Sequence, residues 1–183
     1  MIMVRERIGG LVRHLSGLRE KDARKIYGAE YFISKDLIQN LSLLEEKEWI
    51  QYPGALDLGG NDDYYYVRMQ ATLPESYEGQ EVIFGVHNFG GVRWDTTNPQ
   101  YRVYVNGVLC QGMDENHETV TLDTCGKAGA VYSIVLCIYT GKMHFHSIMD
   151  ARIAVRDKDT EKYYYDVKVP YDVAGLMNEA EDD

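Results

Sequence analysis

Cysteine is scarce in this chain, and its few copies do not suggest cross-links. Three cysteines occur in 183 residues, an odd number, at positions without the close spacing of a metal site. Cys137 lies inside the apolar run SIVLCIYT, where a thiol behaves as a small hydrophobic side chain. We therefore expect Cys110, Cys125 and Cys137 to be reduced and structural.

Long apolar runs are also missing. No segment approaches the roughly 20 consecutive apolar residues that a membrane-spanning helix needs. The N-terminal sequence MIMVRERIGGLVRHL lacks the continuous apolar stretch and the small-residue cleavage site of a secretory signal. The resulting expectation is a cytoplasmic protein.

Positive charge is in deficit. The chain has 19 lysines and arginines against 29 acidic residues, which gives a formal net charge of -10 at pH 7. No compact basic stripe interrupts this negative field, which repels phosphate backbones and anionic lipids. We expect neither nucleic acid nor a membrane surface as a partner.

Signatures of a self-contained catalytic centre are absent as well. Gly90 and Gly91 open no helix and lack the lysine of a phosphate-binding loop. No GxSxG motif occurs, and no pair of carboxylates is singled out for glycoside cleavage. His144 and His146 are two residues apart, but third and fourth metal ligands are missing. We predict no catalytic residue and no metal site, and packing or rim roles for the two histidines.

Periodicity divides the chain into a helical part and a β part. Apolar residues recur at helical spacing from Ile8 to Leu18, although glycines weaken that helix. Residues 34–50 are predicted to form a short amphipathic helix capped by Ser34 or Asp36. From about Tyr64 the period changes to two, which is typical of strands.

The β part predicts a sandwich. Strands are expected over residues 64–73, 81–87, 101–105, 108–111, 119–122, 131–140 and 148–156. The Asn106-Gly107 dipeptide between two of them is typical of a two-residue hairpin. About seven strands without an intervening long helix indicate a mainly β fold, an antiparallel β-sandwich of the jelly-roll kind with an N-terminal helical segment.

The domain organisation follows from these patterns. We expect a helical extension over residues 1–50, the sandwich over 51–170, and an acidic linker or the start of a further domain over 171–183. The tyrosine runs at 64–66 and 163–165 are interpreted as strand residues.

A polar cluster directly after the hairpin is the main candidate for ligand binding. Asp114, Asn116 and His117 offer the donors and acceptors that match vicinal sugar hydroxyls. The same side chains can instead close a turn on their own backbone, as Asx residues commonly do. The residues alone leave both interpretations open.

A second candidate lies in the segment GGVRWDTTNPQ. In a carbohydrate-binding module, Trp94 would stack on a sugar face while Asp95, Asn98 and Gln100 make polar contacts. Trp94 can equally anchor a long loop in the core.

An aromatic-rich strand ends in LP at 73–74, a VYVNG hairpin follows at 103–107, and a GxDxNH pattern occupies 112–117. The order of these motifs resembles the N-terminal domain of family 38 α-mannosidases of the cytosolic and bacterial branch. The resemblance covers roughly residues 50–170. It implies a galactose-binding-like accessory sandwich of a retaining exo-α-mannosidase.

The resemblance also has implications for site and partners. The family's zinc-binding GHxHID motif and nucleophilic aspartate belong to a later catalytic domain, and HFHSIMD at 144–150 is not that motif. No cofactor is therefore implied in this chain, and zinc or a similar divalent ion is expected in the catalytic domain. The implied partners are that domain of the same polypeptide and mannosyl glycans, and a second copy of the chain is a further candidate. The loop at 112–117 would face another domain or the substrate.

Two main hypotheses remain. One is an accessory domain with weak or no sugar affinity of its own, and the other is a free-standing carbohydrate-binding module. Titration with mannose and manno-oligosaccharides separates them, because only the second binds sugar alone. The missing motifs disfavour a third hypothesis, a small hydrolase, which turnover of an aryl α-mannoside lost in Asp114→Ala would support.

Overall fold

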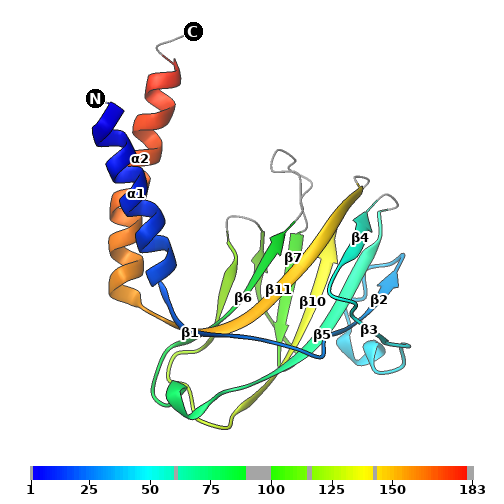
Figure 1. Cartoon of the computed structure of the whole chain (residues 1–183). Coiled ribbons are helices and arrows are strands. Elements are labelled where there is room, and N and C mark those ends of the chain that lie inside the picture. Colours follow the sequence, from blue (N-terminus) through cyan, green and yellow to red (C-terminus); the bar gives the residue numbers. More distant parts are fainter. Residues whose placement is uncertain (1, 60–61, 90–99, 115–116, 142–143, 181–183) are drawn as a thin grey trace. The chain divides into compact units, whose positions relative to one another are not determined.

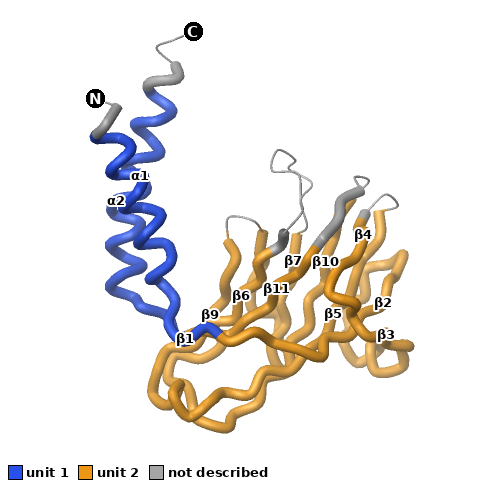
Figure 2. The backbone as a smooth tube through the Cα atoms, viewed as in Figure 1, with its two compact units in different colours: residues 1–23, 155–183 blue, residues 24–154 orange. Residues whose placement is uncertain are grey.

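The chain folds into two compact units. A computed structural model describes residues 2–59, 62–89, 100–114, 117–141 and 144–180 (Figure 1). Unit 1 comprises residues 1–23 and 155–183, and unit 2 comprises residues 24–154 (Figure 2). None of the described helices is both long and apolar enough to cross a membrane.

One antiparallel sheet of unit 2 has six strands, in the spatial order β3-β2-β5-β10-β7-β8. Their bounds are β2 Glu30–Ser34, β3 Ile50–Gln51, β5 Tyr64–Thr72, β7 Gln100–Val105, β8 Val108–Met113 and β10 Val131–Tyr139. Strand β10 pairs with β5 on one side and β7 on the other. The strand predicted over residues 131–140 is therefore confirmed, and it lies inside the sheet.

The second sheet has five strands. Its order is β1-β11-β6-β9, and β4 pairs with β11 beside this path. The bounds are β1 Glu20–Lys25, β4 Leu56–Gly59, β6 Val82–Phe89, β9 Thr119–Asp123 and β11 His144–Arg156. Together with the N-terminal helix α1 (Ile2–Leu18), the two antiparallel sheets confirm the predicted mainly β fold. The first 50 residues are not wholly helical, because β1, β2 and β3 follow α1.

Side-chain alternation along β5 separates the two faces of the six-stranded sheet. Tyr65, Val67, Met69 and Ala71 are all buried and belong to the inner face, which contributes to the sandwich core. The residues between them belong to the opposite face, called the outer face below. Because the period of a strand is two, residues in register across β10 and β7 continue both faces.

The predicted helix over residues 34–50 is wrong. Between the end of β2 and the start of β3 the segment is irregular apart from one 3-10 turn, η1 (Leu41–Leu44), where the Ser42 N–H donates to Asn40 Oδ1 at 3.1 Å. Its apolar side chains cover the outer face of the sheet instead of forming a stripe on a helix. The residues in this contact are Leu37, Ile38, Leu41, Leu44 and Trp49 on the segment, and Phe32, Tyr66, Tyr104 and Cys137 on the strands.

Tyr66 connects this irregular segment to the sheet through a hydrogen bond and a ring contact. The Ile38 N–H donates to Tyr66 Oη at 2.6 Å, and the Tyr66 ring stacks on Phe32 with 5.0 Å between centroids. Burial raises the pKa of the Tyr66 hydroxyl above its ordinary value, so this group stays protonated. Aromatic strand residues thus decided the conformation of a segment whose own sequence indicated a helix.

The Asn106-Gly107 turn is confirmed. Both residues have positive φ, 50° and 81°, as the twist of a two-residue hairpin requires. Asn106 also ties the hairpin to β10, because its Oδ1 accepts the Ser133 N–H at 2.9 Å. The turn is therefore structural.

The C-terminal segment is helical as far as the described residues extend. Helix α2 runs over Lys158–Ala180, so residues 171–180, expected to be an acidic linker or the start of a further domain, are helical. The strand interpretation of the tyrosine run at 163–165 is wrong. Tyr164 is buried with the Arg19 guanidinium 4.4 Å from its ring centroid, so packing outweighed the strand preference of tyrosine.

Asp157 begins α2, and its charge makes the stability of unit 1 depend on pH. Asp157 Oδ1 accepts the Thr160 N–H at 3.0 Å, and Lys21 Nζ lies 2.5 Å from Oδ2. The hydrogen bond from Lys21, followed by the Thr160 N–H, lowers the pKa of this carboxyl to about 2.

We expect unit 1 to lose stability as the pH falls from about 4 to about 2. The pKa of Asp157 is lower in the folded state than in the unfolded chain, so as the pH falls the unfolded chain binds the proton first. The Asp157 carboxylate therefore contributes its full stabilisation only above the ordinary aspartate pKa. Helix unfolding followed by circular dichroism at several pH values measures this loss. Asp157→Asn keeps a cap acceptor without the charge, so its stability should change less over the same pH range; an equal change would contradict the assignment.

Candidate binding site on the six-stranded sheet

The strand register brings polar and aromatic side chains together on the outer face. Tyr64, Tyr139 and Gln100 are aligned across β5, β10 and β7. In the next outward-facing row, Cys137 and Arg102 lie side by side on β10 and β7. Gly112 of β8 continues that row and contributes no side chain opposite Arg102.

These rows form a pocket of about 460 Å³. Its volume falls within the range of roughly 300–1,000 Å³ found for small-molecule sites. The lining residues are Tyr64, Gln100, Tyr101, Arg102, Gly112, Met113, Asp114, Cys137 and Tyr139. We call this cavity the tyrosine pocket.

Two tyrosines form one wall of the tyrosine pocket. The rings of Tyr64 and Tyr139 lie 5.3 Å apart between centroids at an angle of 36°. Tyr139 Oη donates to Asp62 Oδ1 at 3.0 Å, and this hydrogen bond raises the pKa of the Tyr139 hydroxyl. Tyr139 is thus held in place at its hydroxyl while its side chain stays exposed.

Arg102 supplies the positive charge of the tyrosine pocket. Its side chain is exposed, and no carboxylate among the described residues forms an ion pair with it. Below it, burial raises the pKa of the Cys137 thiol, although Tyr66 and Arg102 act in the opposite direction. Cys137 is therefore a protonated floor residue and not a nucleophile, whereas the guanidinium can donate to a ligand.

Asp114 lines the same pocket and contacts His117. Asp114 Oδ1 accepts the backbone N–H of His117 at 2.8 Å and lies 3.0 Å from His117 Nδ1. The His117 side chain is exposed. Of the four predicted site residues, Asp114 lines the pocket and His117 contacts Asp114. Asn116 and Trp94 lie outside the described residues.

Sequence reasoning found only part of this pocket. Gln100 was named as a polar contact of a binding module and does line the cavity, while its neighbours Asp95 and Asn98 lie outside the described residues. Tyr64, Tyr139 and Arg102 were missed. The signal for them is the cross-strand register, which local periodicity does not determine.

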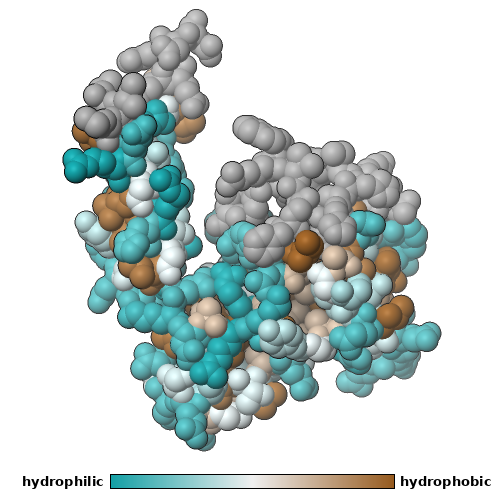
Figure 3. Space-filling view, viewed as in Figure 1, coloured by the Kyte–Doolittle hydropathy of each residue, from teal (hydrophilic) through white to brown (hydrophobic). Residues whose placement is uncertain are grey.

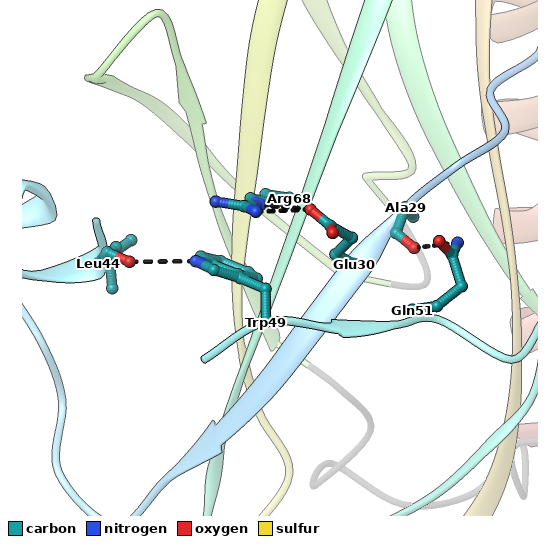
Figure 4. A network of polar contacts seen from close by, with 6 residues as sticks. All are labelled: Ala29, Glu30, Leu44, Trp49, Gln51 and Arg68. Carbon is teal, nitrogen blue, oxygen red and sulfur yellow. Dashed lines mark hydrogen bonds and ion pairs between the residues drawn. The ribbon is translucent and has the colours of Figure 1, made fainter. Parts of the chain in front are cut away.

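A second groove, of about 470 Å³, lies on the same face. Glu30 and Arg68 line it, and Arg68 Nη2 is 2.7 Å from Glu30 Oε2. The Arg68 guanidinium also lies 4.3 Å from the Trp49 ring centroid, and Trp49 Nε1 donates to the Leu44 carbonyl at 3.1 Å (Figure 4). The charge here is already paired, and the network holds the 35–49 segment on the sheet.

Metal binding has little basis in the described part of the chain. Within it, no group of three or more histidine, cysteine, aspartate or glutamate side chains is placed to hold an ion. The backbones of His144 and His146 lie in β11, but their side chains are not among the described ones. His87 Nδ1 lies 2.7 Å from Glu118 Oε1, which is a pair and not a metal cluster.

No protein-family model matches the chain, and no curated protein matches its sequence. Solved structures similar to it include β-glucuronidase from Ruminococcus gnavus in complex with D-glucuronic acid, at 12% identity and a TM-score of 0.48 over 73% of this chain and 29% of that one. The apo structure of the same enzyme gives 13% identity and a TM-score of 0.47 over 73% and 28%. The chain thus spans less than a third of the length of these glycosidases, and no residue role carries over at this identity.

Proposed function

We propose that unit 2 is a non-catalytic saccharide-binding domain whose ligand occupies the tyrosine pocket. The observation that carries this proposal is the pairing of Tyr64 and Tyr139 beside three planar polar groups, those of Gln100, Arg102 and Asp114. Aromatic rings offer an apolar surface to the C–H face of a sugar. Amide, guanidinium and carboxylate groups match its hydroxyls in pairs.

Charge favours a neutral saccharide over an anionic one. Arg102 is the cation of the pocket, while Asp114 lines it and Asp62 holds Tyr139. Residues 24–154 contain 17 acidic and 10 basic residues, so unit 2 has a formal net charge of -7. A carboxylate or phosphate on the ligand would meet this negative field.

The parent protein in this proposal is an exo-α-mannosidase. Support comes from the ordered motifs at 73–74, 103–107 and 112–117, whose resemblance to the family 38 enzymes covers roughly residues 50–170. The ligand is then a mannosyl glycan, and the partner is a zinc-dependent catalytic domain of the same polypeptide. The alternative is a free-standing carbohydrate-binding module, which the same pocket would serve.

Calorimetric titration of the chain with mannose, α-manno-oligosaccharides and glucuronate tests this proposal. We expect millimolar or tighter binding of a neutral manno-oligosaccharide and weaker binding of glucuronate. Glucuronate binding more tightly than every neutral sugar would contradict the charge argument. If the chain binds none of these saccharides, the proposal that it binds sugar without another domain would be contradicted.

Gly112→Val should block the pocket without destabilising the sheet. A Cβ at Gly112 would meet only the Tyr101 backbone oxygen, at 3.7 Å, which is an ordinary contact. The two further methyl groups of valine would enter the cavity beside Arg102. We expect affinity for the manno-oligosaccharide to fall at least about tenfold, with an unchanged melting temperature because valine suits an edge strand.

Gly112→Ala is the matched control for this steric test. Its single methyl group should reduce affinity less than valine does. Equal affinities of the wild-type, alanine and valine chains would show that the saccharide does not occupy the tyrosine pocket.

A further inference from the structure

Unit 1 buries few apolar side chains. Helices α1 and α2 pack against each other, and Leu15 and Tyr164 are the buried large side chains of these helices within the described residues. The packing is close, because a Cβ at Gly9 would lie 2.8 Å from Tyr171 Oη. Two helices with so small a shared core gain little stability from each other, since helix stability in proteins comes mainly from burying an apolar face.

Both helices leave apolar side chains in solvent. On α1 these recur every seven residues. On α2 they follow helical spacing over four turns. The exposed residues that share these spacings, called the helical stripe below, are Val4, Leu11 and Leu18 on α1, and Tyr165, Val169, Val173, Leu176 and Met177 on α2. Figure 3 shows apolar side chains, in brown, at the surface along both helices.

The helical stripe on α2 lies on a different side from the contact with α1. Tyr164 and Gly175 are buried and eleven residues apart, so they share one face of α2. Val169 and Leu176 are seven residues apart and share another face, with 55% and 68% of their surface exposed. A helix with two apolar faces is expected to pack between two neighbouring layers. Within unit 1, α1 provides one such layer for α2, and the second is missing from the described residues of this unit.

We propose that the helical stripe binds a second copy of this chain, so that two helix pairs form an antiparallel four-helix bundle. Charge supports self-association through these helices. Helix α1 carries three arginines and one glutamate, a net charge of +2, whereas α2 carries three lysines and five acidic residues, a net charge of -2. A two-fold axis brings α1 of each copy beside α2 of the other, so the attraction occurs twice.

Charge also favours this surface over the sandwich. Residues 1–23 and 155–183 contain 9 basic and 12 acidic residues, a net charge of -3. Residues 24–154 contain 10 and 17, a net charge of -7. Two copies therefore repel less through unit 1, and this inference is independent of saccharide binding.

Sedimentation equilibrium of the full chain over a range of concentrations tests the proposal. We expect a dimer in the wild-type chain and at least about a hundredfold weaker association in the double variant Val169→Lys/Leu176→Lys, because two charges then enter an apolar interface. Lysine keeps the helix intact, since Asp166 and Asp172 lie three and four residues from the new lysines. Circular dichroism checks that helix content is retained.

The matched control places lysines at equally exposed positions of the sheet. In Val131→Lys/Val108→Lys the replaced side chains are 55% and 65% exposed, and dimerisation should be unchanged. A wild-type chain that stays monomeric at every concentration would overturn the proposal. So would a dimer that the helical double variant leaves intact.

Discussion

Tyr77→Ala should destabilise unit 2 by about 3–5 kcal/mol, a large part of the roughly 5–15 kcal/mol that stabilises a typical domain. Tyr77 ends the 3-10 turn η2 (Glu75–Tyr77) between β5 and β6, and none of its surface is exposed. Its hydroxyl donates to the Ile153 carbonyl of β11 at 3.1 Å. Truncation would leave a ring-sized cavity and a carbonyl without this donor.

The packing around Tyr77 leaves little room for relaxation. A Cβ at Gly126 would lie 2.8 Å both from the Tyr77 backbone oxygen and from Val82 Cγ2. Gly126 therefore lies tightly against Tyr77 and Val82, and packing this close limits how far the surroundings can move into the cavity, so the cost of truncation stays high.

Urea denaturation of three chains measures the size of the effect. Tyr77→Phe removes only the hydroxyl and should cost about 0.5–1.5 kcal/mol, the net contribution of one hydrogen bond. The alanine variant should cost several times more. A phenylalanine variant as unstable as the alanine variant would mean that the hydrogen bond, and not the buried ring, stabilises this corner of the sandwich.

Arg102→Ala should weaken saccharide binding about 10- to 100-fold, the range expected for losing hydrogen bonds from a charged donor. The guanidinium has no carboxylate partner among the described residues, so its donors are available to a ligand. The folded state should not change, because the side chain is exposed on β7.

Two further variants separate the role of Arg102 from a general surface effect. Arg102→Lys keeps the charge but loses the planar fork of donors, so affinity should fall between wild type and Arg102→Ala. Gln70→Ala lies in the other groove of the same face and should bind like wild type. Binding that depends on Gln70 and not on Arg102 would move the site to that groove.

Local signals predicted much of the sandwich because they need only a few residues. The Asn106-Gly107 turn requires two positive φ angles and was recognised from two residues. The period-two burial of β5 was visible in its own sequence. Such signals indicate where strands lie and which side chains share a face, but not which strands pair.

The failures have a common physical cause. The segment 34–50 has helical spacing, but its apolar side chains pack on Phe32 and Tyr66 of the sheet. The tyrosines at 163–165 suit strands, but Tyr164 is buried in unit 1 beside Arg19. In both cases contacts between residues far apart in the sequence outweighed the local preference.

The candidate site also combines a residue that local sequence predicted with residues that only strand pairing brings together. Asp114 was found because it belongs to a short polar cluster. The pairing of Tyr64 with Tyr139 spans 75 positions and follows from the β5–β10 register. No local pattern marks these tyrosines as different from the buried Tyr65. The pocket therefore became visible only when the strands were placed side by side.

The most direct test of the saccharide-binding proposal is a map of backbone amide chemical shifts during titration with an α-manno-oligosaccharide. If the saccharide occupies the tyrosine pocket, saturable shifts should appear at Tyr64, Gln100, Arg102, Gly112 and Tyr139, which surround it. These shifts should disappear in Arg102→Ala while the rest of the spectrum is kept. Shifts confined to other parts of the chain, or no shifts at saturating sugar, would contradict the proposal.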